Sequence, residues 1–178
     1  NDFTEAIVDE LSNMYCLDED RLYAIGYSLG SMFTYEIACQ LNHRFAAVAS
    51  FAGTMPVNPE TCGLSGNIAV MHIHGKLDYI IDYDDDWDWK DGEHEGVGTM
   101  SSVPGMIDSW SARANCASSD VDADFLLEHI THSGCLGDTR VEHYGIELHE
   151  HTWPDEVDGT ATYQLIWDFL SDFTNEEF

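Results

Sequence analysis

Short apolar runs alternate along the chain with longer segments in which apolar residues recur at helical spacing. The short runs are bounded by polar and turn-forming residues, which is typical of buried strands; they lie at 22–25, 45–51 and 68–74. The segments with helical periodicity lie at 28–41, 101–115 and 160–173. Strands that alternate with helices predict an α/β fold, in which a mostly parallel sheet is flanked by helices.

Two further patterns complete the predicted elements. Residues 1–11 have apolar side chains at positions 3, 7, 8 and 11, which form the stripe of an amphipathic helix. Residues 124–132 and 140–148 alternate between apolar and polar side chains, as strands do. These two strands are expected to form a hairpin before the terminal helix.

The first predicted strand runs directly into Gly26-Tyr27-Ser28-Leu29-Gly30, and a predicted helix follows. In this strand–turn–helix context the pattern Gly-x-Ser-x-Gly predicts a nucleophile elbow, a tight turn that exposes the serine. The N–H of Leu29 would then be one donor of an oxyanion hole. The alternative is an ordinary turn in which Ser28 only caps the helix.

Acid and base candidates follow in the order that α/β hydrolases use, which is Ser, Asp or Glu, then His. Asp78 lies just past the strand 68–74, and His149 and His151 follow the strand 140–148. Because ligands meet an open α/β sheet at the carboxyl ends of its strands, Asp78 and one histidine are expected beside Ser28. The alternatives are a solvated turn aspartate and surface histidines.

These motifs resemble the extracellular esterases that include feruloyl esterases, acetylxylan esterases and polyhydroxybutyrate depolymerase-like proteins, within the α/β-hydrolase superfamily. The matching segments are 17–23, 44–49, 52–54, 72–75 with Asp78, 109–110, 114–116, 151–154 and 166–169. The resemblance implies ester hydrolysis without a cofactor or metal, with Ser28 as nucleophile, Asp78 as acid and His151 as base. The pair His149-Glu150 replaces small residues of the related esterases, so His149 stays open as the alternative base.

The resemblance also implies that residues 1–178 are the C-terminal half of one catalytic domain. The nucleophile of this fold normally follows the fifth strand, whereas Ser28 follows the first recognisable one. About four strands, roughly a hundred residues, are therefore expected in an upstream or separate N-terminal half. That half would supply the second oxyanion donor and the strand that pairs with residues 22–25, which otherwise form a bare sheet edge. No signal peptide is visible, as expected if the natural N-terminus lies upstream.

Aromatic and imidazole side chains near the predicted site are expected to contact the substrate: Tyr27, Trp87, Trp89, His149 and Trp153. Indole faces stack on aromatic acyl groups and on sugar rings, so feruloyl or acetylxylan esters are favoured over polyhydroxybutyrate. The acidic segment 82–95 has a second interpretation as a calcium loop, with ligands at Asp84, Asp86, Asp88 and Glu95. Because Trp89 occupies the position that needs glycine, a solvated acidic loop is the favoured interpretation.

The charge balance limits the partners of the chain. Six Lys and Arg residues stand against 34 Asp and Glu residues, which gives a formal net charge of −28. Nucleic acids and anionic membranes would be repelled by such a surface, whereas neutral ester substrates would not.

Five cysteines suggest an oxidising compartment and a secreted, extracellular protein. Cys116 closes a predicted helix and Cys135 lies in the turn of the predicted hairpin, so these two are expected to form a disulfide. A second disulfide is predicted between Cys16 and Cys39, which would both lie at the bottom of the sheet; the alternative for Cys39 is a buried thiol. Cys62 is then left over and is expected to pair with the N-terminal half.

Overall fold

The fold is described from a computed structural model, and the structure describes residues 2–59, 62–63, 67–88 and 98–175. The helices are α1 (Asp2–Met14), α2 (Leu29–Gln40), α3 (Val103–Arg113) and α4 (Thr162–Ser171), with short 3-10 turns at Glu19–Arg21 and Leu136–Asp138. The main strands are β1 (Tyr23–Tyr27), β2 (Ala47–Phe51), β3 (Ala69–Gly75), β6 (Ser118–Ala123), β7 (Leu127–Ser133) and β8 (Val141–Ile146). Two short antiparallel pairs are β4 (Trp87–Asp88) with β5 (Thr99–Met100) and β9 (Glu156–Val157) with β10 (Thr160–Ala161).

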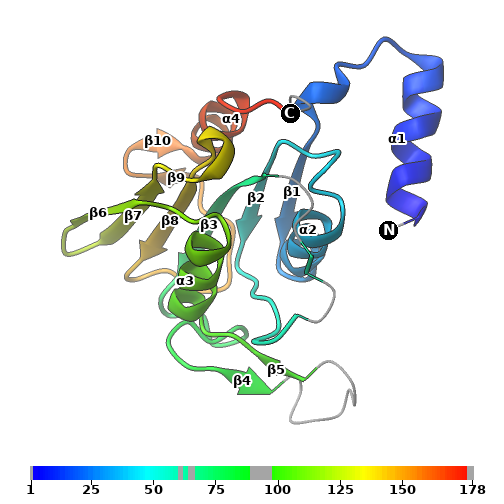
Figure 1. The fold of residues 1–178 in the computed structure, drawn as a ribbon. Coiled ribbons are helices and arrows are strands. Elements are labelled where there is room, and N and C mark those ends of the chain that lie inside the picture. Colours follow the sequence, from blue (N-terminus) through cyan, green and yellow to red (C-terminus); the bar gives the residue numbers. More distant parts are fainter. Residues whose placement is uncertain (1, 60–61, 64–66, 89–97, 176–178) are drawn as a thin grey trace.

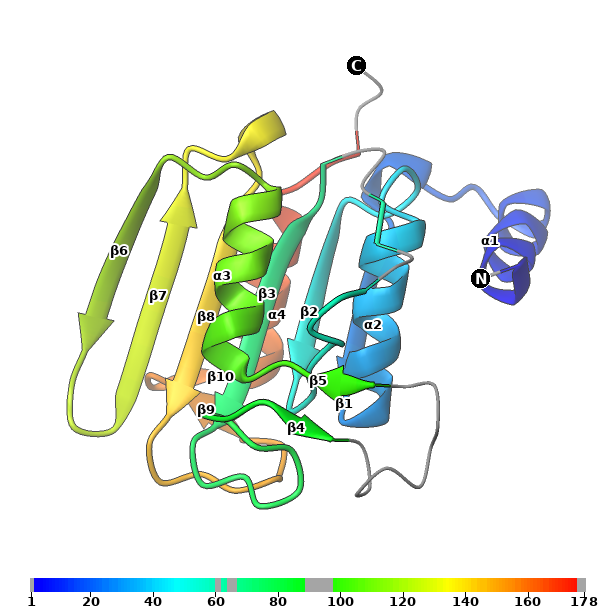
Figure 2. The same cartoon turned by 60° about the horizontal axis from the view of Figure 1, so that its bottom comes forward.

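The main sheet has the strand order β1-β2-β3-β8-β7-β6. Strands β1, β2, β3 and β8 are parallel, and β7 and β6 continue the sheet in antiparallel order. The carboxyl ends of the parallel strands all point to one end of the molecule, where the β4–β5 pair also lies (Figure 2). A mostly parallel sheet with flanking helices confirms the predicted fold class.

Helices cover both faces of the sheet. Helices α2 and α3 lie on one face and α4 lies on the other, while α1 stands apart from the sheet (Figure 1). The first face buries Tyr35, Val70 and Trp110 in one cluster, and the second buries Met71, Ile73 and Phe169 in another. Alternate residues of β3 thus enter opposite clusters, as the two-residue period of a strand requires.

The hairpin prediction is correct in kind and incomplete in extent. Strand β7 pairs with β8, as expected, but it also pairs with β6, which sequence reasoning did not find. Every residue of β6 is exposed. An edge strand that buries neither face lacks the alternation of apolar and polar residues from which strands are recognised.

The opposite edge of the sheet is β1, and exposed apolar side chains lie on it and near it. Ile25 of β1 is 56% exposed, and Leu29 and Phe33 at the start of α2 are also exposed. Helix α1 forms as predicted, yet Phe3 and Ile7 of its apolar stripe are exposed. Within the described residues, β1 pairs with β2 on one side and with no strand on the other. This agrees with the bare edge expected from the sequence.

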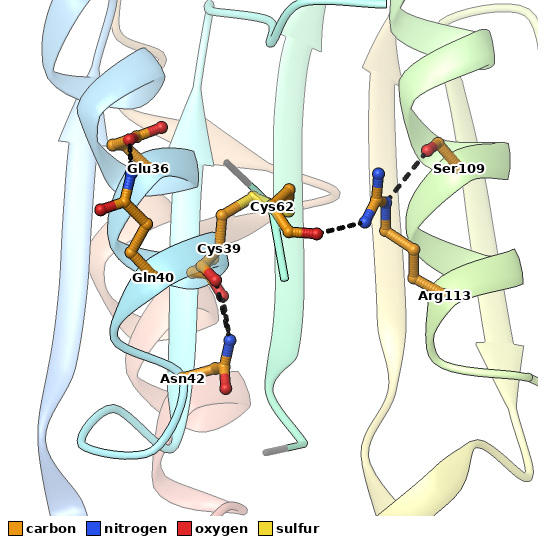
Figure 3. Close-up of a disulfide and its surroundings, with 8 residues drawn as sticks. Glu36, Cys39, Gln40, Asn42, Cys62, Ser109 and Arg113 are labelled. Carbon is orange, nitrogen blue, oxygen red and sulfur yellow. Dashed lines mark hydrogen bonds between the residues drawn. A yellow bond between two sulfur atoms is a disulfide. The ribbon is translucent and has the colours of Figure 1, made fainter. Parts of the chain in front are cut away.

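One disulfide forms as predicted and the other prediction is wrong. Cys116 and Cys135 are bonded, so the end of α3 is linked to the segment between β7 and β8. Cys39 is bonded to Cys62 (Figure 3). Cys16 is an exposed free thiol. The physical reason is that Cys62 lies in the β2–β3 connection, and no local sequence pattern encodes which distant cysteine this connection meets.

The Cys39–Cys62 disulfide is anchored by hydrogen bonds on both sides. Arg113 of α3 donates from Nη1 to the carbonyl oxygen of Cys62 at 3.0 Å, and Asn42 donates to the carbonyl oxygen of Cys39 at 3.0 Å (Figure 3). The disulfide and Arg113 together fasten the long β2–β3 connection to both helices of one face. Two disulfides are typical of a protein from an oxidising compartment.

Candidate active site

Ser28 occupies a strained turn between β1 and α2. Its backbone has φ 56° and ψ −119°, a conformation that a non-glycine residue adopts only where the surroundings enforce it. One enforcing contact is a hydrogen bond of 2.9 Å from the N–H of Ser28 to the carbonyl oxygen of Phe51, at the end of β2. The turn therefore has the strained backbone of a nucleophile elbow, with the serine at its tip.

Two glycines make room for this turn, and only one of them belongs to the sequence pattern. A Cβ atom on Gly26 would lie 2.1 Å from the carbonyl oxygen of Gly30, so any larger residue would collide with the backbone. A Cβ atom on Gly53 would lie 2.7 Å from the carbonyl oxygen of Ser28. A Cβ atom on Gly30 would meet no atom within 4 Å. Gly53, which sequence reasoning missed, thus matters more for the close packing than Gly30.

The structure brings Ser28, His151 and Asp78 into one hydrogen-bonded line. Nε2 of His151 lies 2.9 Å from Oγ of Ser28, and Nδ1 lies 2.6 Å from Oδ2 of Asp78. Ser28 follows β1, Asp78 follows β3 and His151 follows β8. The carboxyl ends of these parallel strands lie together at one end of the sheet. The side chain of Asp78 is fully buried and that of His151 is 8% exposed, so the line is shielded from water except near the serine.

The carboxylate of Asp78 accepts four hydrogen bonds. Oδ1 accepts from the N–H groups of Ile80 and Ile81 at 2.8 and 2.9 Å, and Oδ2 lies near His151 and 3.2 Å from Nε2 of His74. Burial by itself would raise the pKa of Asp78, but the bonds from His74, the two backbone N–H groups and His151 outweigh it and lower the pKa to about 2. The carboxylate is thus ionised at neutral pH and is fixed in orientation.

The acid turn and the histidine loop are joined by backbone contacts. The N–H of Leu77 donates to the carbonyl oxygen of His149 at 2.9 Å. A Cβ atom on Gly75 would lie 2.3 Å from that same oxygen, so glycine is needed for the close approach. Nε2 of His149 donates to the carbonyl oxygen of Thr152 and closes the turn. Of the two candidate histidines, His151 is the one that reaches Ser28.

Aromatic side chains lie beside the serine. The ring of Tyr27 stacks on Phe51 at 5.5 Å, and the ring of Trp153 meets Phe51 edge-on at 5.4 Å. The hydroxyl of Tyr27 donates to the carbonyl oxygen of His151 at 2.9 Å, which ties the first aromatic ring to the histidine loop. His149 packs edge-on against Phe51 at 6.3 Å. Three of the expected substrate contacts, Tyr27, His149 and Trp153, therefore gather around Phe51, which sequence reasoning did not single out.

Leu29 is the first residue of α2, so its N–H lies at a helix N-terminus, where no carbonyl oxygen of the preceding turn can accept it. The N–H is adjacent in sequence to Ser28 and is available to a developing negative charge. The side chain of Leu29 is 65% exposed and takes no part in the core.

The acidic segment after β3 is only partly described. Trp89 and Glu95 lie outside the described residues, whereas Trp87 lies in β4 and is half-buried. Asp86 accepts a hydrogen bond from the N–H of Ser102, and Asp88 accepts one from the hydroxyl of Thr99. These carboxylates thus bind their own chain, and the described residues contain no group of three or more His, Cys, Asp or Glu side chains that could hold a metal ion. No helix in the described ranges has the length and apolar character needed to cross a membrane.

The fold is of the α/β-hydrolase type. Residues 1–88 match the family model described as Phospholipase/Carboxylesterase. A solved structure, an acetyl xylan esterase from Aspergillus awamori, superposes with a TM-score of 0.65 at 14% identity and covers 96% of this chain and 66% of that chain. At this identity the structural likeness shows the fold alone.

The chain is similar in sequence to several esterases. A bifunctional acetylxylan esterase/xylanase of Neocallimastix patriciarum is 24% identical over 94% of this chain and 22% of its own length. Feruloyl esterase C of Emericella nidulans is 29% identical over 46% of this chain and 30% of its own length. A protein of Nocardia uniformis subsp. tsuyamanensis, named as an esterase, is 40% identical over 47% of this chain and 24% of its own length. The resemblance to acetylxylan and feruloyl esterases is thus confirmed, and the chain spans less than a third of the length of each of these curated relatives.

Proposed function

We propose that this protein is a serine carboxylic ester hydrolase. The observation that supports this function best is the line Ser28 Oγ–His151 Nε2–His151 Nδ1–Asp78 Oδ2, with separations of 2.9 and 2.6 Å. A strained serine next to a histidine that a buried carboxylate orients is the arrangement of an activated nucleophile. Residues 1–178 would be the C-terminal half of a single catalytic domain.

In this mechanism Ser28 attacks the ester carbonyl carbon while His151 takes the hydroxyl proton at Nε2. The N–H of Leu29 would donate to the oxyanion, and a second donor would come from an N-terminal half. His151 then returns the proton to the leaving alcohol, and Asp78 stabilises the transient imidazolium. Departure of the alcohol leaves the acyl group esterified to Ser28. Water then attacks this acyl carbon while His151 takes one of its protons, and the bond to Oγ breaks as His151 returns that proton to Ser28 and the acid is released. No cofactor is needed for these steps.

The proposed substrates are plant cell-wall esters of the feruloyl or acetylxylan type. The proposal is supported by the names of the relatives and by the exposed aromatic side chains of Tyr27 and Trp153, which pack on Phe51 beside Ser28. Aromatic faces stack on a feruloyl ring or a sugar ring, and a net charge of −28 does not oppose a neutral ester. The two disulfides support a secreted protein.

The nucleophile is tested with a fluorophosphonate probe, applied to the chain alone and together with an N-terminal half. Ser28 should be labelled, and Ser28→Ala should abolish labelling. Cys16→Ser is the control, because Cys16 is exposed and unbonded, and this variant should be labelled like the wild type. Labelling that persists in Ser28→Ala would overturn the assignment.

Two alternatives remain as outcomes of further assays. A polyhydroxybutyrate depolymerase-like esterase would prefer hydroxybutyrate oligomers over methyl ferulate and acetylated xylan by more than about tenfold in kcat/KM, or about 1.4 kcal/mol. A non-catalytic binding chain that needs a separate N-terminal partner would show no turnover by itself. Intact-mass and gel measurements on the natural protein, with and without reductant, would show whether such a second polypeptide accompanies it.

A further inference from the structure

A buried chain of polar side chains leads away from the candidate active site into the core. The hydroxyl of Tyr35 lies 2.6 Å from Nδ1 of His72, Nε2 of His72 lies 3.0 Å from Nδ1 of His74, and Nε2 of His74 lies 3.2 Å from Oδ2 of Asp78. Tyr35, His72 and His74 are each at most 1% exposed. The hydrolytic steps described above use none of these three side chains.

The hydrogen-bond direction is fixed where this chain of side chains meets Asp78. Nε2 of His74 faces the carboxylate of Asp78 and, at 3.2 Å, the carbonyl oxygen of Ile81; both groups only accept, so this nitrogen donates. At this end of the chain His74 therefore acts as a hydrogen-bond donor.

His72 connects His74 to Tyr35. Burial lowers the pKa of His72 well below its ordinary value, so this ring is neutral. Nε2 of His72 hydrogen-bonds Nδ1 of His74, and Nδ1 of His72 hydrogen-bonds the hydroxyl of Tyr35. Burial raises the pKa of Tyr35, so its hydroxyl stays protonated. A chain of three buried side chains, Tyr35, His72 and His74, thus ends at the carboxylate of Asp78.

We propose that His74, held in place by its hydrogen bond to His72 and, through His72, by Tyr35, is a positioning residue for the carboxylate of Asp78. This inference rests on the proposed function, because it assigns His74 a role toward the acid of that site. His74 gives Oδ2 of Asp78 a second donor beside His151, on the side that faces the core. Tyr35 lies on α2, the helix that follows Ser28, so the chain also ties this helix to the acid turn.

The test compares two buried histidines that pack on the same ring. The ring centroid of His74 lies 5.2 Å from that of His72, and the ring centroid of His143 lies 5.5 Å from that of His72. His143 bonds the carbonyl oxygen of His72 and the hydroxyl of Tyr83, not Asp78. His74→Phe and His143→Phe therefore remove equally buried imidazoles, but only the first removes a donor to Asp78.

The first measurement is carboxyl-carbon NMR, which follows the titration of Asp78 without any need for activity. His74→Phe should raise the pKa of Asp78 from about 2, and His143→Phe should leave it unchanged. Nitrogen NMR of the wild type should show a proton on Nε2 of His74. Equal pKa values of Asp78 in the two variants, or a His74 ring without a proton on Nε2 at pH 7, would overturn the proposal.

The second measurement is ester hydrolysis by the active protein. His74→Phe should lower kcat about tenfold to hundredfold with little change in KM, since a hydrogen bond to a charged group contributes on this scale. His74→Gln places an amide N–H near the same position and should recover most of the loss, whereas Tyr35→Phe should show a smaller loss than His74→Phe. An equal loss of kcat in His74→Phe and His143→Phe would contradict the positioning role. If wild-type Ser28 fails to react with the probe, the proposed function fails, and the NMR comparison still decides the role of His74.

Discussion

At the scale of single residues, the hydrogen-bonding environment of each histidine decides its role. His151 bonds a hydroxyl on one side and a carboxylate on the other, whereas His149 closes its own turn through Thr152. His72 and His143 lie in the core, where burial lowers the pKa of each. These differences lead to two predictions.

The first prediction separates His151 from His149. His151→Ala should lower turnover by about 10⁴-fold, since a serine without its general base retains little of its reactivity. His149→Ala removes a ring that packs on Phe51 and should mainly raise KM. Steady-state kinetics on one soluble ester measures both, and the opposite pattern would assign the base to His149.

The second prediction concerns stability in acid. Burial, followed by the nearby His74, lowers the pKa of His143 from 6.5 to about 3, and burial lowers that of His72 too. Between pH 6.5 and about 3 the unfolded chain binds a proton at each position that the folded chain does not bind. The free energy of unfolding should therefore fall as pH falls, by up to about 1.4 kcal/mol per pH unit for each histidine.

Urea unfolding between pH 7 and pH 4 measures this slope. His143→Phe should reduce it by up to one proton, because the unfolded chain then has one histidine fewer to protonate. The lowered pKa of Asp78 adds a loss only at lower pH, between its ordinary value of 3.8 and about 2. An unchanged slope in His143→Phe would mean that His143 takes up its proton in the folded protein.

At the scale of elements, the two disulfides fasten connections that the sheet does not hold. Cys39–Cys62 closes 23 residues between α2 and the β2–β3 connection, and Cys116–Cys135 closes 19 residues between α3 and the segment before β8. Closing a loop of this length lowers the conformational entropy of the unfolded chain, which stabilises the folded state by about 3 kcal/mol per disulfide. The double variant Cys39→Ala, Cys62→Ala should lower the free energy of unfolding by roughly this amount.

Denaturant unfolding under non-reducing conditions tests this, with Cys16→Ser as the matched control. Cys16 is exposed and unbonded, so its replacement should leave stability unchanged. A loss in Cys16→Ser as large as that of the double variant would instead support the Cys16–Cys39 pairing expected from the sequence.

At the scale of the whole molecule, the net charge of −28 dominates the electrostatics. The described cations are already engaged: Arg21, Arg44, Lys76 and Arg140 pair with carboxylates, and Arg113 bonds the carbonyl oxygen of Cys62. The remaining carboxylates repel one another across the surface. This repulsion is screened by salt, since the Debye length falls to about 3 Å at 1 M ionic strength.

The melting temperature should therefore rise between low and molar sodium chloride, and a thermal melt series measures it. A flat or falling response would show that the carboxylates are locally compensated. A parallel titration with calcium separates the causes, because a large shift at micromolar calcium would restore the metal-loop interpretation of residues 82–95.

The hydrophobic pattern and the short motifs predicted the elements and the three central side chains, for a local reason. A strand followed by Gly-x-Ser-x-Gly exposes Ser28 at a turn, and parallel strands place Asp78 and His151 at the same end of the sheet. The three residues are far apart in sequence, but each lies at the end of a strand that its own neighbours specify. The choice between His149 and His151 needed the family resemblance as well.

The sequence by itself thus determined the fold class, the elbow and the Cys116–Cys135 pair. Only the tertiary structure decided that Cys62 meets Cys39, that Gly53 packs against the elbow, and that His74 bonds Asp78 from inside the core. Each of these contacts depends on how connections and neighbouring strands cross one another. Periodicity records which face of an element is buried, but it does not record which distant residue lies against that face.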